Sequence, residues 1–534
     1  MKLLNLLKLK YLIILEMAAF IYAVKSYIVN IYPRHFDQIQ YLAEVYRSYE
    51  KYRLDGLMAG FKETFTNPSA QGAIYDSLAL LIMMALGAGR LSALLLNIIA
   101  FIGWQIIIFY SIRKIFSSQN LAITAAALPL ALSGIWQINS PGTAFDFRLD
   151  YLAMCLYGAS AFMYILTDNF KNKKWSVIFS FVVALTILCR YLTVVYFLAI
   201  FLFIVPIYIN KGLQLKNILG CALMVTILTL PFFIFNYELI YNYYVIGHVL
   251  GEEQAIRASG FNIFQTFWYI VQIGFIKQIG SFFYYILALI LFVSTFSLLR
   301  NKSLKPDKGQ LVNVNLLKAG LFFIMPPLLL LSLETQTSEV VLSILIPGFL
   351  LLIFSVVWPL LKNLHSHRPN SINYLCLILV FLITVNFCTN LIKVPYEESY
   401  RRSADEVNQV ANLVSQFSQE RHINNIKIGA DRITDHLDAQ ILRVVIYEKI
   451  GVLMPLEMTL PIGIFHISDE KIMDQLKKTD IYIETNAPKL VDGFPYDMDM
   501  QANYEQIHQF CLQHMIFVKG TNIFGRSISL YVKN

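Results

Sequence analysis

The amino-acid sequence predicts a polytopic α-helical membrane protein of about eleven transmembrane helices, with a C-terminal extracytoplasmic α/β domain. Three observations predict this fold class. The 534 residues are 57% hydrophobic and only 15% charged, which lies outside the range of soluble globular chains. Many apolar stretches are long enough for the helix of roughly 20 residues that a bilayer requires. After Pro395 the composition changes to that of a water-soluble domain.

The distribution of Lys and Arg sets the predicted topology, because cytoplasmic loops are enriched in both residues. Placing every basic cluster in the cytoplasm leaves an odd number of spans, with the N-terminus inside and the C-terminal domain outside. Segment 71–88 must then not span, and we expect a half-inserted helix there. The spans expected on this path are residues 8–29, 90–112, 119–139, 147–167, 175–190, 191–209, 217–237, 280–300, 314–333, 338–361 and 371–392.

The first span has an alternative interpretation. A basic stretch, residues 2–10, precedes an apolar run, which is also the pattern of a secretory signal peptide. Because the apolar run continues through Ile28 and reaches full spanning length, we favour an uncleaved anchor.

The predicted path leaves four outer loops. They comprise residues 30–70, 139–150, 236–261 and 333–340. In the first loop, apolar residues recur every three or four positions between charged ones, which predicts a helix lying on the membrane surface. Its apolar positions are Phe36, Ile39, Leu42, Tyr46 and Tyr49.

Residues 395–534 are expected to form a small α/β domain, separate from a transmembrane domain of residues 1–394. Apolar residues at helical spacing predict helices near 403–420, 436–449 and 502–514. Short apolar or alternating runs predict strands in IKIGA, IYIET and the terminal SISLYV.

Charged residues collect in the outer loops, and this is the most informative feature of the sequence. A charge in or beside a membrane is costly, so each one calls for a partner or a function. The candidates are Asp37 in the first loop, Asp146, Arg148 and Asp150 in the second, Arg190 between two apolar runs, His248, Glu252 and Arg257 in the third loop, and Glu334 in the fourth.

Each candidate also has a purely structural interpretation. Asp37 could cap the surface helix that starts beside it, and the second-loop charges could form a local ion-pair cluster that closes a turn. For Glu252 and Glu253, a solvated helix face is favoured over a site. Arg190 could extend its side chain to the interface. Glu16, inside the first span, fits either a structural hydrogen bond or a partner for a buried cation.

This arrangement resembles the GT-C superfamily of membrane glycosyltransferases. The resemblance is carried by Asp37 in the first loop, the Asn67-Pro68…Tyr75 stretch before the half-inserted helix, the acidic second loop and the outer C-terminal domain. The nearest group is that of the protein mannosyltransferases and lipid A aminoarabinose transferases. The stretches FDFRLDYLAMCLYG and GHVLGEEQAIRA further resemble bacterial, in particular cyanobacterial, members. The adjacent acidic pair common in the family is absent, because Gln38 follows Asp37.

The resemblance implies transfer of a hexosyl or pentosyl unit from a polyprenyl-phosphate carrier to a lipid, glycan or protein acceptor of the cell envelope. The reaction would take place at the outer face of the plasma membrane. Asp37 is the expected general base for the acceptor, with Asp146 and Asp150 as further catalytic candidates. Cationic side chains should stabilise the leaving phosphate. The expected substrate-binding residues are Arg148, Arg190, His248, Glu252, Arg257, Tyr75 and Glu334.

Several alternatives remain open at this point. Asp146 and Asp150 could hold a divalent cation such as Mg²⁺ or Mn²⁺, whereas the six cysteines lack the spacing of a metal site or a disulfide framework. Competing functions are a membrane transporter or flippase, an O-antigen ligase or polymerase-like enzyme, and a non-catalytic glycan-binding protein. Charges in outer loops, rather than at mid-membrane, favour the enzyme over the transporter. The net charge of +8 is attributed to cytoplasmic loops and not to nucleic-acid binding.

Overall fold

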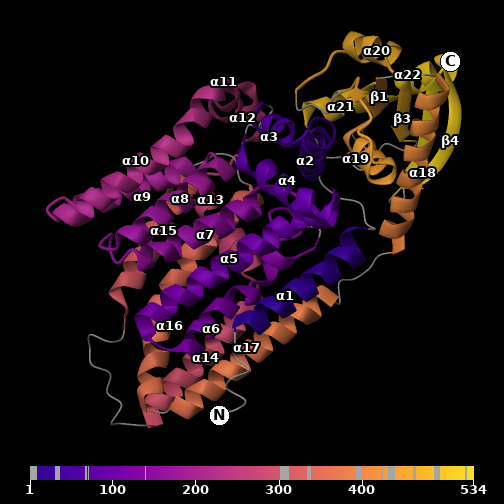
Figure 1. Cartoon of the computed structure of the whole chain (residues 1–534). Coiled ribbons are helices and arrows are strands. Elements are labelled where there is room, and N and C mark those ends of the chain that lie inside the picture. The colour runs from indigo at the N-terminus through magenta and orange to yellow at the C-terminus, as the bar shows by residue number, and fades with distance from the viewer. Residues whose placement is uncertain are drawn as a thin grey trace.

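The structure is a computed structural model of the whole chain. It consists of a bundle of long helices with a smaller α/β unit at one end (Figure 1). It describes residues 9–29, 36–66, 69, 71–138, 140–300, 312–333, 338–367, 369–392, 398–421, 425–430, 439–460, 465–485, 494–523 and 526–534.

Each of the spans expected from the sequence overlaps a helix, although several of these helices are shorter than a full span. In chain order these are α1 (Leu9–Ala23), extended by the π-helical turn η2 (Val24–Ile28), α5 (Arg90–Phe116), α6 (Gln119–Ala127), α7 (Asp150–Leu166), α8 (Lys173–Cys189), α9 (Thr193–Tyr208), α10 (Gly212–Phe235), α14 (Ser281–Arg300), α15 (Val314–Leu333), α16 (Ile346–His367) and α17 (Pro369–Ile392).

Within the described residues, six helices are long and apolar enough to cross a membrane. The number rises to seven if a bent pair counts as one span. This pair joins α13 (Ile263–Ile270) and η6 (Val271–Lys277) to α14 through a bend of 76°. Neither α13 nor η6 was expected from the sequence. The structure thus supports a multi-pass membrane protein, and the full set of predicted spans stays a prediction.

Segment 71–88 contains a short apolar helix, α4 (Ile74–Leu86). Its 13 residues extend about 20 Å at the usual helical rise. A hydrocarbon core of roughly 30 Å is too thick for such a helix to cross. The length of α4 therefore agrees with the expectation that this segment does not span.

The first predicted outer loop forms two helices, and the expected surface helix packs differently from the prediction. In α2 (Phe36–Asp55), the apolar residues Ile39, Leu42 and Tyr46 are buried. They pack against α4 and against α19 (Ala439–Ile450), and the Tyr46 and Tyr447 rings lie 4.8 Å apart. The apolar face of α2 thus meets protein and not lipid. Exposed apolar side chains lie instead at Leu57, Met58 and Phe65 of α3 (Leu57–Thr66).

The C-terminal unit contains a five-stranded mixed sheet in the order β2-β1-β3-β5-β4. Strands β1 (Ile426–Ala430), β2 (Leu456–Met458) and β3 (Ile481–Thr485) run parallel, while β5 (Arg526–Lys533) pairs antiparallel with β3 and with β4 (Met515–Ile523). The predicted strands correspond to β1, β3 and β5. The unit also contains β2, β4, α20 (Asp469–Lys477) and α21 (Pro495–Ala502), none of which was expected from the sequence.

Helices cover both faces of this sheet. One face packs Ile481 and Ile483 against α18 (Glu398–Arg421) and α19, and Tyr482 turns to the other face. There it meets α20, α21 (Pro495–Ala502) and α22 (Tyr504–His514). This alternation follows the two-residue period of a strand.

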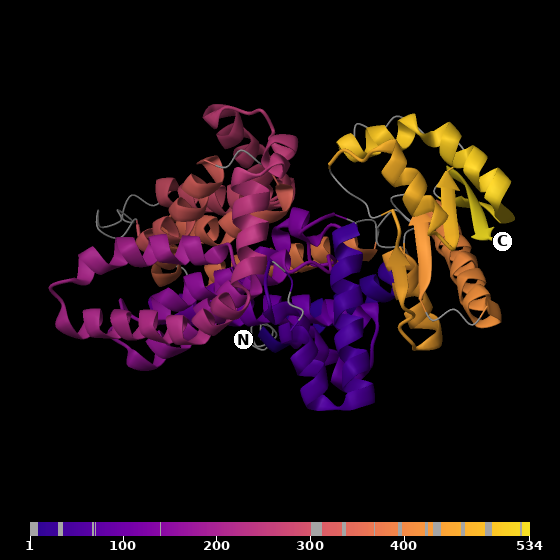
Figure 2. The ribbon, with the colours of Figure 1, turned by 90° about the horizontal axis from the view of Figure 1, so that it is seen from above.

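The C-terminal unit is attached to the N-terminal part of the chain by a charged contact. Figure 2 shows this unit, coloured orange to yellow, beside the indigo N-terminal helices. Arg90, at the start of α5, donates from Nε and Nη2 to the two carboxylate oxygens of Glu448 in α19, at 2.8 and 2.9 Å. The Tyr46 hydroxyl donates to the same carboxylate at 2.8 Å. This contact joins α2, α5 and α19 at one point.

Candidate functional site

A pocket of about 590 Å³ lies where several helix ends meet. Its walls come from the end of α8, the start of α9, the end of α15, the 3₁₀-helical turn η7 (Glu339–Leu345) and the segment from α11 (Tyr237–Tyr241) to α12 (Glu252–Arg257), called here the α11–α12 segment. The Asp, Arg and His side chains that line the pocket are Arg148, Asp150, Arg190, His248 and Arg257. Of the ten residues named as site candidates from the sequence, these five are brought together.

Arg190 occupies the centre of the polar lining. It follows α8 in an extended conformation, which turns the chain back into α9. Its Nε lies 3.3 Å from Oδ1 of Asp150, and its Nη1 donates to the side-chain oxygen of Gln71. Because only 13% of the Arg190 side chain and 6% of the Asp150 side chain are exposed, solvent screens this pair little. Arg190 thus has a specific structural setting, unlike a side chain that merely extends to water.

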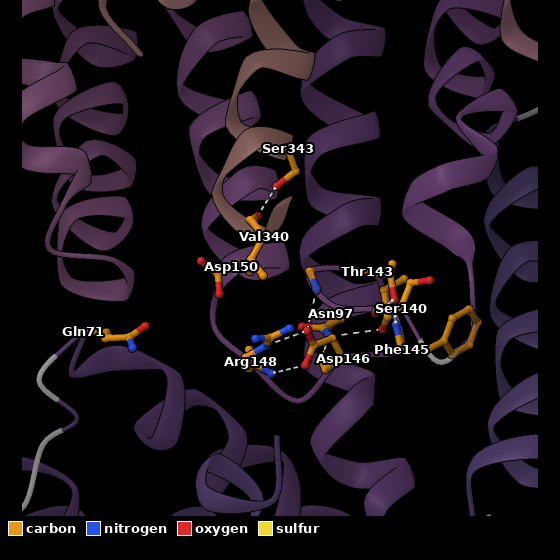
Figure 3. A network of polar contacts seen from close by, with 12 residues as sticks. Gln71, Asn97, Ser140, Thr143, Phe145, Asp146, Arg148, Asp150, Val340 and Ser343 are labelled. Atoms are coloured by element: carbon orange, nitrogen blue, oxygen red, sulfur yellow. Dashed lines mark hydrogen bonds and ion pairs between the residues drawn. The ribbon is translucent and has the colours of Figure 1, made fainter. Parts of the chain in front are cut away.

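Asp146 and Arg148 form the local cluster that closes the second predicted loop (Figure 3). The buried Asp146 carboxylate accepts from Gly142 N at 2.5 Å, from Arg148 N at 2.9 Å and from Arg148 Nε at 2.9 Å. Asn97 Nδ2 donates to the carbonyl oxygens of Ala144 and Asp146, which fixes the same turn. Asp146 does not line the pocket, so these contacts favour a positioning role for it.

Asp150 differs from Asp146 in both location and partner. It lines the pocket and lies in the first turn of α7, where the helix dipole favours a negative charge. Its partner Arg190 comes from the turn between α8 and α9. Asp146 and Arg148 therefore form a pair that closes the turn, whereas Asp150 forms a separate pair with Arg190 in the pocket wall.

The α11–α12 segment forms one side of the pocket mouth. In the π-helical turn η5 (Asn242–Leu250), His248 Nδ1 lies 2.7 Å from the Tyr243 carbonyl oxygen. Arg257 extends over the Phe494 ring of the C-terminal unit at 5.7 Å. Glu252 is exposed and does not line the pocket, which agrees with the solvated-face interpretation.

Three further candidates lie away from the pocket lining or outside the described part of the chain. Tyr75 is buried under α2, with its ring edge-on to Tyr41 at 6.0 Å. Position 37 lies one helical turn before Tyr41 on α2, although the Asp37 side chain is outside the described residues. Glu334 is outside them as well.

Tyr41 connects α2 with the pocket. Its hydroxyl lies 3.3 Å from Ser69 Oγ. Burial raises the pKa of the Tyr41 phenol well above its usual range, and the nearby Arg190 opposes this effect only in part. The phenol therefore stays neutral and can act as a hydrogen-bond donor beside the Asp150–Arg190 pair.

Gln71, Tyr243 and Tyr244 are among the polar residues of the lining that sequence reasoning missed. Gln71 lies only a few residues after the Asn67-Pro68 stretch, and both tyrosines lie in the NYYVIGH run, but nothing in the local pattern distinguishes them. Glu16, for which two interpretations remained open, accepts from Gln105 Nε2 at 3.1 Å. This contact favours the structural hydrogen bond.

The lining as a whole combines positive charge with an apolar wall. Three arginines and one carboxylate line the pocket, and its apolar side consists of residues from the start of α9 and the end of α15, among them Val195, Leu330 and Leu331. Such a pocket can bind an anionic group that continues into an apolar chain. Among the described residues, no group of three or more His, Cys, Asp or Glu side chains is arranged to hold a metal ion.

Comparison with known proteins yields a fold match. No protein-family model matches the sequence, and no curated protein matches it at a significant level. Two crystal structures of ArnT from Cupriavidus metallidurans, one in the apo state and one bound to undecaprenyl phosphate, match the structure with a TM-score of 0.59 each. In both cases the sequence identity is 12%, and the match covers 98% of either chain. The chain thus has the fold of ArnT over its whole length, as expected from the GT-C resemblance.

Proposed function

We propose that this protein is a membrane glycosyltransferase that takes a sugar from a polyprenyl-phosphate carrier. The observation that carries the proposal is the pocket in which Arg148, Arg190 and Arg257 adjoin an apolar wall. A structure with the same fold, that of ArnT, contains bound undecaprenyl phosphate, which has this combination of phosphate and apolar chain.

The arginines suit the chemistry of the departing carrier. When an acceptor hydroxyl or amine attacks C1 of the sugar, a new bond forms to C1 and the bond between C1 and the phosphate oxygen breaks. The bonding electrons leave with the phosphate, which gains negative charge. Preorganised guanidinium groups stabilise this charge more in the transition state than in the ground state, and this difference accelerates the reaction.

The acceptor proton needs a carboxylate base, and we propose Asp37. Its position one turn before Tyr41 on α2 supports this assignment, because Tyr41 is near enough to Arg190 and Asp150 for their charges to act on its phenol. Asp150 is the alternative base. Its carboxylate is already engaged in the ion pair with Arg190.

The acceptor and the location of the reaction complete the proposal. We propose a lipid, glycan or protein acceptor that approaches at the outer face of the plasma membrane, where the C-terminal unit adjoins the pocket through the contact of Arg257 with Phe494. An O-antigen ligase or polymerase-like reaction would use the same pocket with a larger donor.

The test is turnover of the purified protein in nanodiscs. Polyprenyl-phosphate sugars would be supplied with a membrane lipid extract, and the release of free polyprenyl phosphate would be measured. Asp37→Asn is expected to lower this release by about 10²-fold or more. Asp55→Asn is the matched control, because Asp55 lies on the same helix and its side chain is 56% exposed.

The outcomes separate the competing assignments. Equal release by wild type and Asp37→Asn would remove Asp37 from the mechanism and make Asp150 the base to examine. If wild type released nothing with any donor but still bound polyprenyl phosphate, the transporter or ligase interpretation would replace the proposal.

A further inference from the structure

Gln71 links parts of the pocket wall that are far apart in the sequence. Its backbone is fixed first, because Tyr191 N donates to the Gln71 carbonyl oxygen at 2.9 Å and Ala73 N donates to the Leu188 carbonyl oxygen at 2.8 Å. Gly72 lies so close to the end of α8 that a Cβ there would be 1.9 Å from the Cys189 carbonyl oxygen. The end of the first loop is therefore held against the end of α8.

The Gln71 side chain then makes two different hydrogen bonds. Its Nε2 donates to the Tyr243 hydroxyl at 2.6 Å, and its Oε1 accepts from Nη1 of Arg190. A carboxamide suits this position because it offers a donor and an acceptor together. A glutamate would lose the donor, a lysine would lose the acceptor, and an asparagine is one methylene shorter.

Tyr243 lies in a part of the pocket wall that has little packing of its own. None of the residues of α11 or η5 is buried. Segments with few buried contacts open at low free energy, so a single hydrogen bond can alter their position. The polar chain Asp150–Arg190–Gln71–Tyr243 thus connects α7 and the end of α8 to the α11–α12 segment.

We propose that Gln71 is a positioning residue that couples the α11–α12 segment to Arg190, so that the pocket is complete only when this segment is docked. The coupling of segment and arginine goes beyond the proposed function, and its consequence for phosphate binding rests on that function. Gln71 acts through Arg190 and Tyr243 and takes no part in bond making or breaking.

A double-mutant cycle tests the coupling. Gln71→Ala and Tyr243→Phe would be measured singly and together, with undecaprenyl phosphate as the ligand and its Kd as the readout. Each single substitution is expected to raise the Kd by about 2- to 10-fold, as for the loss of one hydrogen bond. Since both substitutions break the same link, the double variant should bind no more weakly than the weaker single variant. A Kd increase equal to the product of the two single effects would overturn the proposal.

Hydrogen exchange of the apo protein gives a second readout that needs no ligand. Gln71→Ala, Gln71→Glu and Tyr243→Phe should each speed exchange in residues 237–257. Gln119→Ala, an exposed glutamine at the start of α6, is the control and should leave this exchange unchanged. Unchanged exchange in all three variants would refute the coupling. Failure of wild type to bind undecaprenyl phosphate would refute the proposed function and the consequence for phosphate binding, while the exchange experiment would still decide the coupling.

Discussion

The close approach of Gly72 to the end of α8 leads to a prediction whose magnitude can be worked from the structure. In Gly72→Ala, the added Cβ would lie 1.9 Å from the Cys189 carbonyl oxygen and 2.6 Å from its carbonyl carbon. Both are backbone atoms, which cannot rotate away as a flexible side chain would. The two segments must therefore separate, and the hydrogen bonds Tyr191 N to Gln71 O and Ala73 N to Leu188 O are lost.

Two lost backbone hydrogen bonds should cost about 1–3 kcal/mol in the free energy of unfolding. Displacement of Gln71 also removes an acceptor from the Arg190 guanidinium. Gln71→Ala removes the same acceptor, so Gly72→Ala should raise the Kd for undecaprenyl phosphate to a similar extent, about 2- to 10-fold. Thermal unfolding in nanodiscs and a binding titration measure the two effects separately.

Gly103→Ala is the matched control. Gly103 lies within α5, and a Cβ there would meet nothing within 4 Å. Replacing a helical glycine by alanine should leave binding unchanged and raise stability by about 1 kcal/mol or less. If Gly72→Ala unfolded at the wild-type temperature and bound with the wild-type Kd, the fixed position of Gln71 would be refuted.

Further predictions concern other parts of the molecule. Arg190→Lys should lower kcat/KM for the donor by about 10- to 100-fold, because an ammonium group lacks the fork that serves two partners; turnover at the wild-type level would exclude a role of the guanidinium. Glu448→Ala should lower the free energy of unfolding by about 3–5 kcal/mol, because the buried Arg90 would lose its carboxylate partner. Since the Glu448 side chain is 24% exposed, we expect a value near the lower end of this range, which denaturant unfolding would measure. Burial, and then the nearby Glu44, raise the pKa of Asp76 well above its usual range. The stability that depends on protonated Asp76 is therefore complete below the unfolded pKa of about 3.9 and is lost as the pH rises through the raised folded pKa. Asp76→Asn should remove this loss, so its advantage in Tm over wild type should grow with pH, and parallel Tm curves would contradict the assignment. Turnover should survive EDTA if the arginines supply the positive charge at the phosphate, and activity restored by Mg²⁺ or Mn²⁺ after chelation would show instead that a divalent cation is required.

The helices of the membrane part could be predicted because each apolar run carries its own signal. A run such as 90–112 needs no partner to be recognised, and the structure contains α5 there. By contrast, α2 carries an amphipathic pattern that fits a membrane surface as well as a protein surface. Whether its apolar face meets lipid or α19 depends on residues some 400 positions away, such as Tyr447. Local periodicity contains no such information.

The candidate site could be predicted in its residue types but not in its pairing. The sequence indicated that Asp146, Arg148 and Asp150 lie close together, because they fall within five positions. It could not show that Asp146 closes the turn while Asp150 pairs with Arg190. Gln71 could not be predicted as a site residue, because a neutral amide has little desolvation cost at a membrane surface. Its role becomes visible only when its partners Arg190 and Tyr243 are known.

The burial of α2 between α4 and α19 has a consequence for exchanging parts between related proteins. Ile39, Leu42 and Tyr46 are covered jointly by the helix bundle and by the C-terminal unit. A chimera that joined the helix bundle of this protein to a foreign C-terminal unit would leave that face uncovered and Arg90 without Glu448. To fold, such a graft would have to carry α2 together with α19. In an exchange between related proteins, α2 therefore belongs with the C-terminal unit. A junction placed only where the last span ends would separate the two.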